Sequence, residues 1–295
     1  MKRELLQILG EENVKFFEPL KNHCTFRIGG PAMAFATPTN FTDLFEVLRL
    51  ASEYGKRYKI VGNASNILFS DCGFDGVVVC TKKINSFCKL DESRIVASAG
   101  MSLAELGKFA TDEGLSGLEF SSGIPATVGG AICMNAGAYG GEISSVLNSV
   151  TFLCEGKVVT KKRDEIAWGY RTSEFLGSQN IVLFAEFQLK KDLPDEIKKR
   201  VQENLKIRNS SQPKGFSAGC IFKKTGGESA GKLIDQAGLK NKRKNGAVVS
   251  NTHANFIINE NNATASDVCL LIEEIQEVVL SKFDVRLETE IEIVR

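Results

Sequence analysis

The feature that most constrains this 295-residue chain is a glycine-rich segment at 117–142, GLEFSSGIPATVGGAICMNAGAYGGE. It holds seven glycines among small and apolar residues and few long polar side chains. Glycine lets the main chain approach other groups closely, so this segment must pack against other backbone or against a flat ligand. Buried backbone needs hydrogen-bond partners. A tightly packed buried loop is one solution, and an extended cofactor passing main-chain donors is the solution that the composition favours.

A second loop follows a strand-like run in IVGNASNILFSD, residues 60–71. Its small and hydrogen-bonding residues are Gly62, Asn63, Ala64, Ser65 and Asn66. Such loops present backbone N–H groups to phosphate oxygens, because small side chains let the ligand come close. A plain tight turn is the more common reading of this loop alone. The chain contains neither G-x-G-x-x-G nor a P-loop pattern, so a nucleotide here needs a different cradle.

Two further segments carry reactive side chains. In WGYRTSEF (168–175), Arg171 fits either a surface cation–π contact or a planar clamp for a carboxylate or enolate. In SAGCIFKK (217–224), Cys220 follows Gly219 and is either a small core residue or a placed acid or nucleophile. The two lysines that close this segment are typical of a solvated face, with phosphate binding as the alternative.

The C-terminal segment RLETEIEIVR alternates in polarity like a strand. Alternation places Glu288, Glu290 and Glu292 on one face. These carboxylates either face solvent together, or one of them points into a cleft. The residue pattern alone leaves both readings open.

Helix and strand signals alternate along the chain. Apolar spacing and capping residues predict helices at 42–54, from Ser102 to Gly114, from Pro194 onward, at 231–237 and at 266–283. Strands are expected at 58–61, 253–258 and 286–295, and the polar run 209–213 is the best linker candidate. This mixture predicts an α+β protein of at least two units.

Charge and composition exclude several classes of protein. Lysine and arginine number 37 against 36 aspartates and glutamates, so no net charge draws the chain to nucleic acid. The N-terminus lacks the apolar run of a signal peptide, and no run would insert into a membrane, so we expect a cytoplasmic protein. Eight cysteines without a C-x-x-C motif and only two histidines predict neither a disulfide framework nor a metal site.

In their order along the chain, these motifs resemble the UDP-N-acetylenolpyruvoylglucosamine reductase (MurB) family. The resemblance begins at NHCTFRIGG (22–30) and continues through the 62–66 loop, the glycine-rich segment and YRTS. SAGCIFK, HANFIIN and LETEI complete it, so it covers nearly the whole chain. The short segment after Arg171 resembles the compact subtype, which lacks an extra tyrosine-bearing loop.

The resemblance implies a two-part FAD-binding region of the vanillyl-alcohol-oxidase-like type, followed by a smaller α+β substrate domain. The expected boundaries are 1–80, 81–208 and 209–295. Members use NADPH and FAD to reduce the enolpyruvyl ether of UDP-N-acetylglucosamine to UDP-N-acetylmuramate, in two half-reactions, for peptidoglycan synthesis. A monomer acting on a UDP-sugar, without nucleic acid, is expected.

The resemblance also implies roles for individual residues. Arg171 falls on a catalytic arginine, Glu290 on a catalytic glutamate, and Cys220 on a position usually held by a proton-donating serine. A thiol is the stronger acid, so this replacement is chemically sound. The implied FAD-binding residues are Gly62, Asn63, Ala64, Ser65, Asn66, Gly123, Ile124, Pro125, Ala126, Thr127, Gly130, Asn135, Gly137, Ala138, Tyr139 and Arg208. The implied substrate-binding residues are Tyr170, Gln212, Lys223 and Lys224, although Lys224-Thr225 departs from the family's Asn-Pro.

Three other functions compete with this one. A flavin-dependent oxidoreductase of the same fold would act on a different substrate. A hydrolase or acyltransferase would use Cys220 as nucleophile and needs a base. His253 is the only plausible base, and its apolar surroundings favour a structural histidine. The remaining alternative is a non-catalytic sugar-nucleotide binding module.

Overall fold

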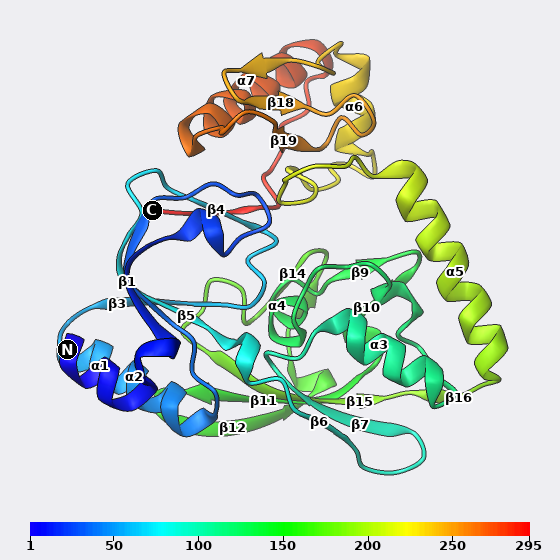
Figure 1. The fold of residues 1–295 in the computed structure, drawn as a ribbon. Helices are drawn as coiled ribbons and strands as arrows, with labels where there is room; N and C mark the ends of the chain where they lie inside the picture. Colours follow the sequence, from blue (N-terminus) through cyan, green and yellow to red (C-terminus); the bar gives the residue numbers. More distant parts are fainter. The chain divides into compact units, whose positions relative to one another are not determined.

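The computed structural model describes all residues from 1 to 295, and the chain divides into two compact units (Figure 1). Unit 1 comprises 1–14, 36–63 and 78–208, and unit 2 comprises 15–35, 64–77 and 209–295. Each unit therefore collects segments that lie far apart in the sequence. The predicted domain boundaries at 80 and 208 stay a prediction.

Unit 1 is built on a five-stranded antiparallel sheet with the order β12-β11-β15-β7-β6. The strands β11, β15 and β7 bury Val150, Phe152, Phe187 and Ile95, whereas the edge strand β12 is rich in lysine and largely exposed. Charged edge strands resist pairing with other chains. The sheet strands are β6 (Phe87–Lys89), β7 (Arg94–Ser98), β11 (Leu147–Cys154), β12 (Lys157–Lys162) and β15 (Ile181–Gln188).

Helices and short hairpins complete unit 1. Helix α4 packs against β15 and β7, and α3 precedes it along the chain (Figure 1). Leu103, Leu106 and Ala110 form the buried face of α3, and the Ser102 side chain accepts a hydrogen bond from Glu105 N–H, as its capping pattern predicts. The helices are α1 (Lys2–Leu9), α2 (Phe41–Glu53), α3 (Leu103–Asp112), α4 (Val128–Cys133) and α5 (Pro194–Ser211). The remaining strands are β3 (Arg57–Val61), β8 (Leu115–Ser116), β9 (Gly137–Ala138), β10 (Gly141–Glu142), β13 (Trp168–Gly169), β14 (Thr172–Ser173) and β16 (Lys190–Lys191).

Unit 2 contains a three-stranded sheet, β17-β18-β19, which packs against α7 (Figure 1). The apolar face of α7 includes Val268, Leu271, Ile275 and Val279, which recur at helical spacing. Thr264 caps this helix. The elements wholly in unit 2 are β4 (Ile67–Phe69), α6 (Ala230–Gln236), β17 (Arg243–Lys244), β18 (Ala247–Val249), β19 (Ile257–Asn259), α7 (Ala265–Phe283) and β20 (Glu292–Val294). Strands β1 (Val14–Pro19), β2 (Pro31–Ala36) and β5 (Phe74–Cys80) lie mostly in unit 2 and have residues in both units.

The N-terminal segments of unit 2 join its C-terminal strand. Strand β20 pairs in parallel with β4, so Glu292 lies opposite Ile67 and Val294 opposite Phe69. The Asp71 carboxylate accepts hydrogen bonds from Ala265 N–H at 2.7 Å and Ser266 N–H at 3.0 Å. It therefore caps the first turn of α7 from a distant part of the sequence.

Three predicted elements were wrong in extent. The linker at 209–213 is partly helical, because α5 continues to Ser211 and ends only where Pro213 disfavours helical backbone at the preceding residue. The strand predicted at 253–258 is β19, which starts at Ile257, because the Ser250 hydroxyl accepts hydrogen bonds from Thr252 and His253 N–H in a turn. The strand predicted at 286–295 is regular only at 292–294.

Candidate active site

Unit 1 brings together the first loop and the glycine-rich segment. The Asn63 side chain donates to the Pro125 carbonyl at 3.0 Å and accepts from Lys82 Nζ at 3.2 Å. A Cβ atom on Gly62 would lie 2.1 Å from Thr127 Oγ1, so no side chain fits at this position. The two loops therefore touch through the Asn63 side chain and through close packing of the Gly62 main chain on the Thr127 side chain. A phosphate-binding cradle requires main chain that is approached this closely.

The glycine-rich segment is itself fixed by backbone hydrogen bonds. The Ala126 carbonyl accepts from Leu103 N–H at 3.0 Å, and Val128 N–H donates to the Met101 carbonyl at 2.8 Å. Part of this segment thus pairs with protein, as the buried-loop interpretation requires. Residues Gly123, Pro125 and Gly130 nevertheless remain exposed.

Helix α5 is attached to the same segment of unit 1. Arg200 on α5 donates to the Glu119 carboxylate at 2.9 Å and to Asp192 at 2.6 Å, and Asn204 donates to the Glu119 carbonyl at 3.1 Å. Arg208 lies on the final turns of α5, and a Cβ on Gly123 would be 2.7 Å from Arg208 Cδ. The anchored helix thereby places the Arg208 side chain against the glycine-rich segment.

Burial alone would raise the pKa of the Glu119 carboxyl, but its hydrogen bonds lower that pKa below the ordinary value. The donors are the backbone N–H groups of Glu119 and Gly117, together with Arg200 and Ser116. Hydrogen bonds to a carboxylate favour its charged form. Glu119 is therefore a charged anchor at neutral pH.

Arg171 occupies a strained turn in unit 1. It lies between β13 and β14 with φ of 54°, in the left-handed region that non-glycine residues rarely adopt. Its Nη2 donates to the Gly137 carbonyl at 2.7 Å, and its Cζ lies 5.2 Å from the centre of the Tyr170 ring. The Asn135 amide holds the hairpin by donating to the Gly169 carbonyl at 3.0 Å. Such strain often marks a functional position.

Tyr139 and Asn135 also have positive φ, at 52° and 42°. Unit 1 thus assembles the following predicted site residues: Gly62, Asn63, Gly123, Ile124, Pro125, Ala126, Thr127, Gly130, Asn135, Gly137, Ala138, Tyr139, Tyr170, Arg171 and Arg208. Unit 2 holds the others: Ala64, Ser65, Asn66, Gln212, Cys220, Lys223, Lys224 and Glu290.

Unit 2 places Cys220 and Glu290 on adjacent segments. Cys220 pairs with Phe256, and Phe222 pairs with Thr289 on the other side of the same segment. Glu290 N–H donates to the Ile221 carbonyl at 2.7 Å. Two positions 70 residues apart in the sequence are therefore neighbours in the fold.

The two carboxylates of LETE differ in their surroundings. The Glu288 side chain is 72% exposed and lies 3.6 Å from Lys223 Nζ. Glu290 is half-buried, and its carbonyl accepts a hydrogen bond from the Asn66 side chain at 3.0 Å. Asn66 thus holds the Glu290 segment through its side chain, while its predicted cofactor contact stays a prediction.

The eight cysteines are all free thiols, and they differ in burial. Cys24 and Cys80 are buried, and burial raises the pKa of both thiols above the ordinary value. Cys220 is partly buried, as are Cys133, Cys154 and Cys269, and it follows Gly219, whose φ of 79° favours glycine. The chain bends at Gly219 and then enters the segment that contains Cys220.

His253 behaves as a structural residue. Its Nδ1 accepts from Asn255 N–H at 3.3 Å, and its ring packs on Phe256 with 4.9 Å between centres. Burial lowers the pKa of His253, with repulsion from Lys240 as a smaller cause. A neutral histidine whose Nδ1 already accepts a hydrogen bond gives no support to the nucleophilic-cysteine alternative.

Several residues near Cys220 were not recognised from the sequence. The Thr25 hydroxyl donates to the Ser217 carbonyl at 2.7 Å, and Arg27 lies 5.6 Å from the Phe216 ring centre. Asn255 is buried and bonds to Phe222 through its side chain. The only signal for these residues was their place in NHCTFRIGG and HANFIIN, because contacts across 30 to 190 residues leave no local pattern.

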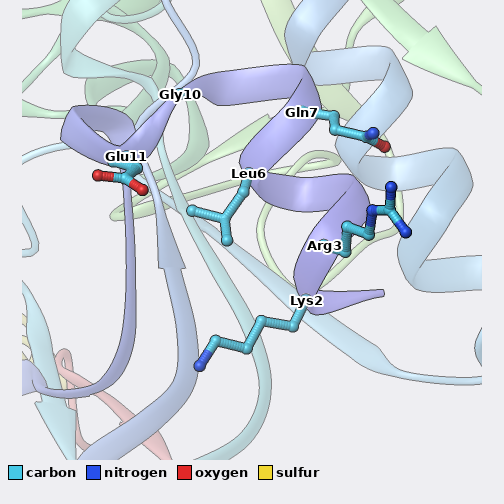
Figure 2. A pocket seen from close by; sticks show the side chains of 6 residues that line it. All are labelled: Lys2, Arg3, Leu6, Gln7, Gly10 and Glu11. Atoms are coloured by element: carbon cyan, nitrogen blue, oxygen red, sulfur yellow. The ribbon is translucent and has the colours of Figure 1, made fainter.

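A shallow pocket of about 560 Å³ lies elsewhere, on α1 and the turn that follows it. Its lining residues are Lys2, Arg3, Leu6, Gln7, Gly10 and Glu11. Figure 2 shows that Arg3 and Gln7 extend to one side of α1, whereas Lys2 and Leu6 extend to the other. None of them belongs to the predicted site. No group of three or more His, Cys, Asp or Glu side chains is placed to hold a metal ion, and no helix has the length and apolarity needed to span a membrane.

Two stretches of the chain match known protein families. Residues 32–161 match the family described as FAD binding domain. Residues 211–294 match UDP-N-acetylenolpyruvoylglucosamine reductase, C-terminal domain. A solved alkyldihydroxyacetonephosphate synthase covers 64% of this chain, with 16% identity and a TM-score of 0.51, which shows the fold alone. The family matches and the fold thus define a flavoprotein of the oxidoreductase class, and the predicted vanillyl-alcohol-oxidase-like α+β fold is confirmed.

Full-length relatives give the family. The UDP-N-acetylenolpyruvoylglucosamine reductase of Geobacillus kaustophilus is 42% identical over 99% of this chain and 96% of its own length. That of Clostridioides difficile is 41% identical over 98% of this chain and 96% of its own length. The solved reductase from Thermus caldophilus has a TM-score of 0.83 and 35% identity, over 96% of this chain and 98% of its own. The chain belongs to the UDP-N-acetylenolpyruvoylglucosamine reductase family.

Proposed function

We propose that this protein reduces the enolpyruvyl ether of UDP-N-acetylglucosamine to UDP-N-acetylmuramate, with FAD as cofactor and NADPH as electron donor. The names of its full-length relatives support the reaction. The supporting observation in the structure is the hydrogen bond from Glu290 N–H to the Ile221 carbonyl, which makes the Cys220 and Glu290 segments neighbours. Peptidoglycan precursor synthesis in the cytoplasm, by a monomer, is the proposed setting.

The cradle in unit 1 fits a dinucleotide cofactor. Gly62 admits no side chain beside Thr127, and Gly123 and Pro125, just before Thr127 in the chain, are exposed. Residues Gly62–Asn66, Gly123–Thr127, Gly130, Asn135, Gly137–Tyr139 and Arg208 would hold FAD. When bound, FAD would supply a ring that accepts hydride from NADPH and donates it to the terminal vinyl carbon of the substrate.

Arg171 is proposed to bind the substrate carboxylate. A planar guanidinium matches the two oxygens of a carboxylate, and it stabilises negative charge that develops on the enolate beside it. The strained turn and the bond to the Gly137 carbonyl would hold the guanidinium in place before substrate arrives. Tyr170 next to it, together with Gln212, Lys223 and Lys224, is proposed to bind the rest of the substrate.

Cys220 is proposed to complete the reaction by protonation. As the carbon–carbon double bond is consumed, its terminal carbon gains hydride and the carbon bearing the ether oxygen gains the Sγ proton. An unperturbed thiol has a pKa of about 8.5, so it is protonated at neutral pH and still acidic enough to donate. The thiolate left behind regains its proton from water. Glu290, on the neighbouring segment, is the third proposed catalytic residue.

The half-reactions test this function directly. Purified protein should be yellow, anaerobic NADPH should bleach the flavin absorbance, and the enolpyruvyl UDP-sugar should restore it. Stopped-flow absorbance at the flavin band measures both steps. A folded protein that takes up no FAD would refute the flavoenzyme, whereas a bleached flavin that this substrate leaves reduced would refute the substrate alone.

A further inference from the structure

The Cys220 segment is held from one side by a buried asparagine. Asn255 is 6% exposed, and its side chain makes a matched pair of hydrogen bonds with the main chain of Phe222. Its Oδ1 accepts from Phe222 N–H at 2.9 Å, and its Nδ2 donates to the Phe222 carbonyl at 2.8 Å. Both ends of the amide are used, so its orientation is determined by its partners.

The main chain of Asn255 contributes to the same contact. Its carbonyl accepts from Ile221 N–H at 2.8 Å, and its N–H donates to His253 Nδ1 at 3.3 Å. Asn255 therefore fixes two consecutive residues, Ile221 and Phe222, directly after Cys220. A buried polar side chain with this many partners is rigid, because leaving any partner unpaired is unfavourable.

The opposite edge of the segment carries Glu290. The Ile221 carbonyl accepts from Glu290 N–H at 2.7 Å, and Lys223 N–H donates to the Glu288 carbonyl at 2.9 Å. The 220–223 segment is thus bonded on two sides, to Asn255 on one and to the 288–290 segment on the other, through isolated bridges rather than a regular strand. If the 220–223 segment lost its bonds to Asn255 and shifted, Cys220 and Glu290 would move together.

We propose that Asn255 is a positioning residue for the proton-donating half of the site: it sets the place of Cys220 and Glu290 through Ile221 and Phe222 without touching substrate. This inference rests on the proposed function. The geometry that supports it, however, concerns only the 220–223 segment. Its bonds to this segment distinguish Asn255 from an asparagine that only stabilises unit 2.

Asn259 offers a matched control in the same unit. It is 7% exposed, and its side chain donates to the Phe26 carbonyl at 3.0 Å and accepts from Ala263 N–H at 2.8 Å. Replacement by alanine removes a comparable set of buried hydrogen bonds in Asn255→Ala and Asn259→Ala. Of these two asparagines, only Asn255 bonds to the 220–223 segment through its side chain.

The first readout is the labelling of Cys220 by iodoacetamide, followed by mass spectrometry of its peptide in the FAD-loaded enzyme. Releasing the 220–223 segment should speed labelling about fivefold in Asn255→Ala, because local opening exposes the Cys220 thiol more often. Asn259→Ala should label like the wild type. Equal labelling in folded Asn255→Ala and wild type would overturn the proposal.

The second readout separates the two half-reactions. In Asn255→Ala, recovery of flavin absorbance by substrate should slow about 10- to 100-fold, since small misplacements of reacting groups have effects of that size. Bleaching by NADPH should stay within about twofold of the wild-type rate, because it does not use the Cys220 thiol. Equal slowing of both steps would mean a structural role and would also overturn the proposal.

Asn255→Asp covers the case in which the alanine variant does not fold. The new side chain keeps the acceptor for Phe222 N–H but loses the donor to the Phe222 carbonyl until the carboxyl is protonated. The labelling difference from wild type should therefore shrink as pH falls, and a pH-independent difference would contradict the proposal. If labelling follows these expectations but substrate fails to reoxidise the wild-type flavin, the positioning role holds and the proposed substrate fails.

Discussion

In unit 1, the predicted cofactor loop at Gly62 packs too closely against its neighbour for a side chain, whereas in unit 2 the predicted reacting residues Cys220 and Glu290 lie on segments joined by hydrogen bonds. Gly62 against Thr127 represents the first arrangement, with 2.1 Å left for a Cβ. Cys220 and Glu290, linked through Ile221, represent the second. A cradle for a large ligand depends on the absence of side chains that would block the ligand. A proton donor depends instead on a side chain held in the correct position. The two units should therefore fail in different ways when they are changed.

The largest effect is expected from Cys220→Ala in unit 2. Removing a general acid slows the step that uses it by about 10²- to 10⁴-fold. Recovery of flavin absorbance by substrate should fall by that factor, while FAD content and bleaching by NADPH remain close to the wild type. Stopped-flow spectra measure both steps.

Cys220→Ser is the matched control, because a hydroxyl occupies the position that the family's usual serine would hold. We expect it to keep much of the turnover. Full turnover in the alanine variant would show that Cys220 is a packing residue and that the proton comes from elsewhere.

The next largest effect is expected from Gly62→Ala in unit 1. The new methyl group meets Thr127, whose side chain is buried and already bonded to Gly130 N–H. Overpacking of this kind typically amounts to about 1–3 kcal/mol, so FAD affinity should fall about 10- to 100-fold. Equilibrium titration of apoprotein with FAD, followed by fluorescence, measures it.

Thr127→Ala tests whether contact with Thr127 is the cause. On its own it should destabilise α4 by about 1 kcal/mol through loss of the cap. Added to Gly62→Ala, it should recover part of the lost affinity, because the obstructing atoms are gone. Strictly additive losses in the double variant would mean that the two residues act independently.

A smaller effect is expected from Glu119→Gln, which weakens the anchor of α5 in unit 1. Losing charged hydrogen bonds at a largely buried site should lower the free energy of unfolding by about 1–3 kcal/mol. The folded pKa of Glu119 is lowered, so its contribution is present above the unfolded value near 4.3 and is lost as pH falls below that value. Urea denaturation of both proteins at pH 7 and pH 4 measures this.

Glu196→Gln is the control on the same helix. It removes an exposed ion pair with Lys199, and such pairs contribute about 0–1 kcal/mol. A loss of stability in this control equal to that in Glu119→Gln would argue against Glu119 as an anchor.

The smallest effect concerns His253 in unit 2. Its pKa is lowered in the folded state, so the unfolded chain binds a proton more readily and stability falls as pH drops below about 6.5. Between pH 7.5 and pH 5.5, the wild type should lose up to about 1 kcal/mol more than His253→Asn, whose side-chain oxygen can still accept from Asn255 N–H. Thermal denaturation at both pH values measures the difference, and equal losses would refute a neutral buried histidine.

Local sequence patterns predicted the elements that local chemistry controls. The Ser102 cap and the apolar face of α7 both lie where the sequence indicates them. Extents were less predictable. Helix α5 runs to Ser211 through residues with weak helix propensity, and only Pro213 stops it.

The candidate site was predicted mainly through motifs, and its geometry was not. Asn255 was hidden in HANFIIN, which reads as an apolar strand, because its partners lie on Phe222. The Glu119 anchor was missed for the same reason, since Arg200 is 81 residues away. No periodicity in one segment reports a hydrogen bond to another.

The sequence by itself determined the mixed fold class, the glycine positions, and the residue types available for acid, clamp and cradle. These depend on backbone conformation and on side-chain chemistry, which are properties of each residue. Only the tertiary structure decided that Glu288 faces Lys223 and solvent while Glu290 joins the Cys220 strand. It also decided which asparagine holds that strand. Neighbouring carboxylates in an alternating segment are chemically equal until a second strand pairs with them and gives each a different environment.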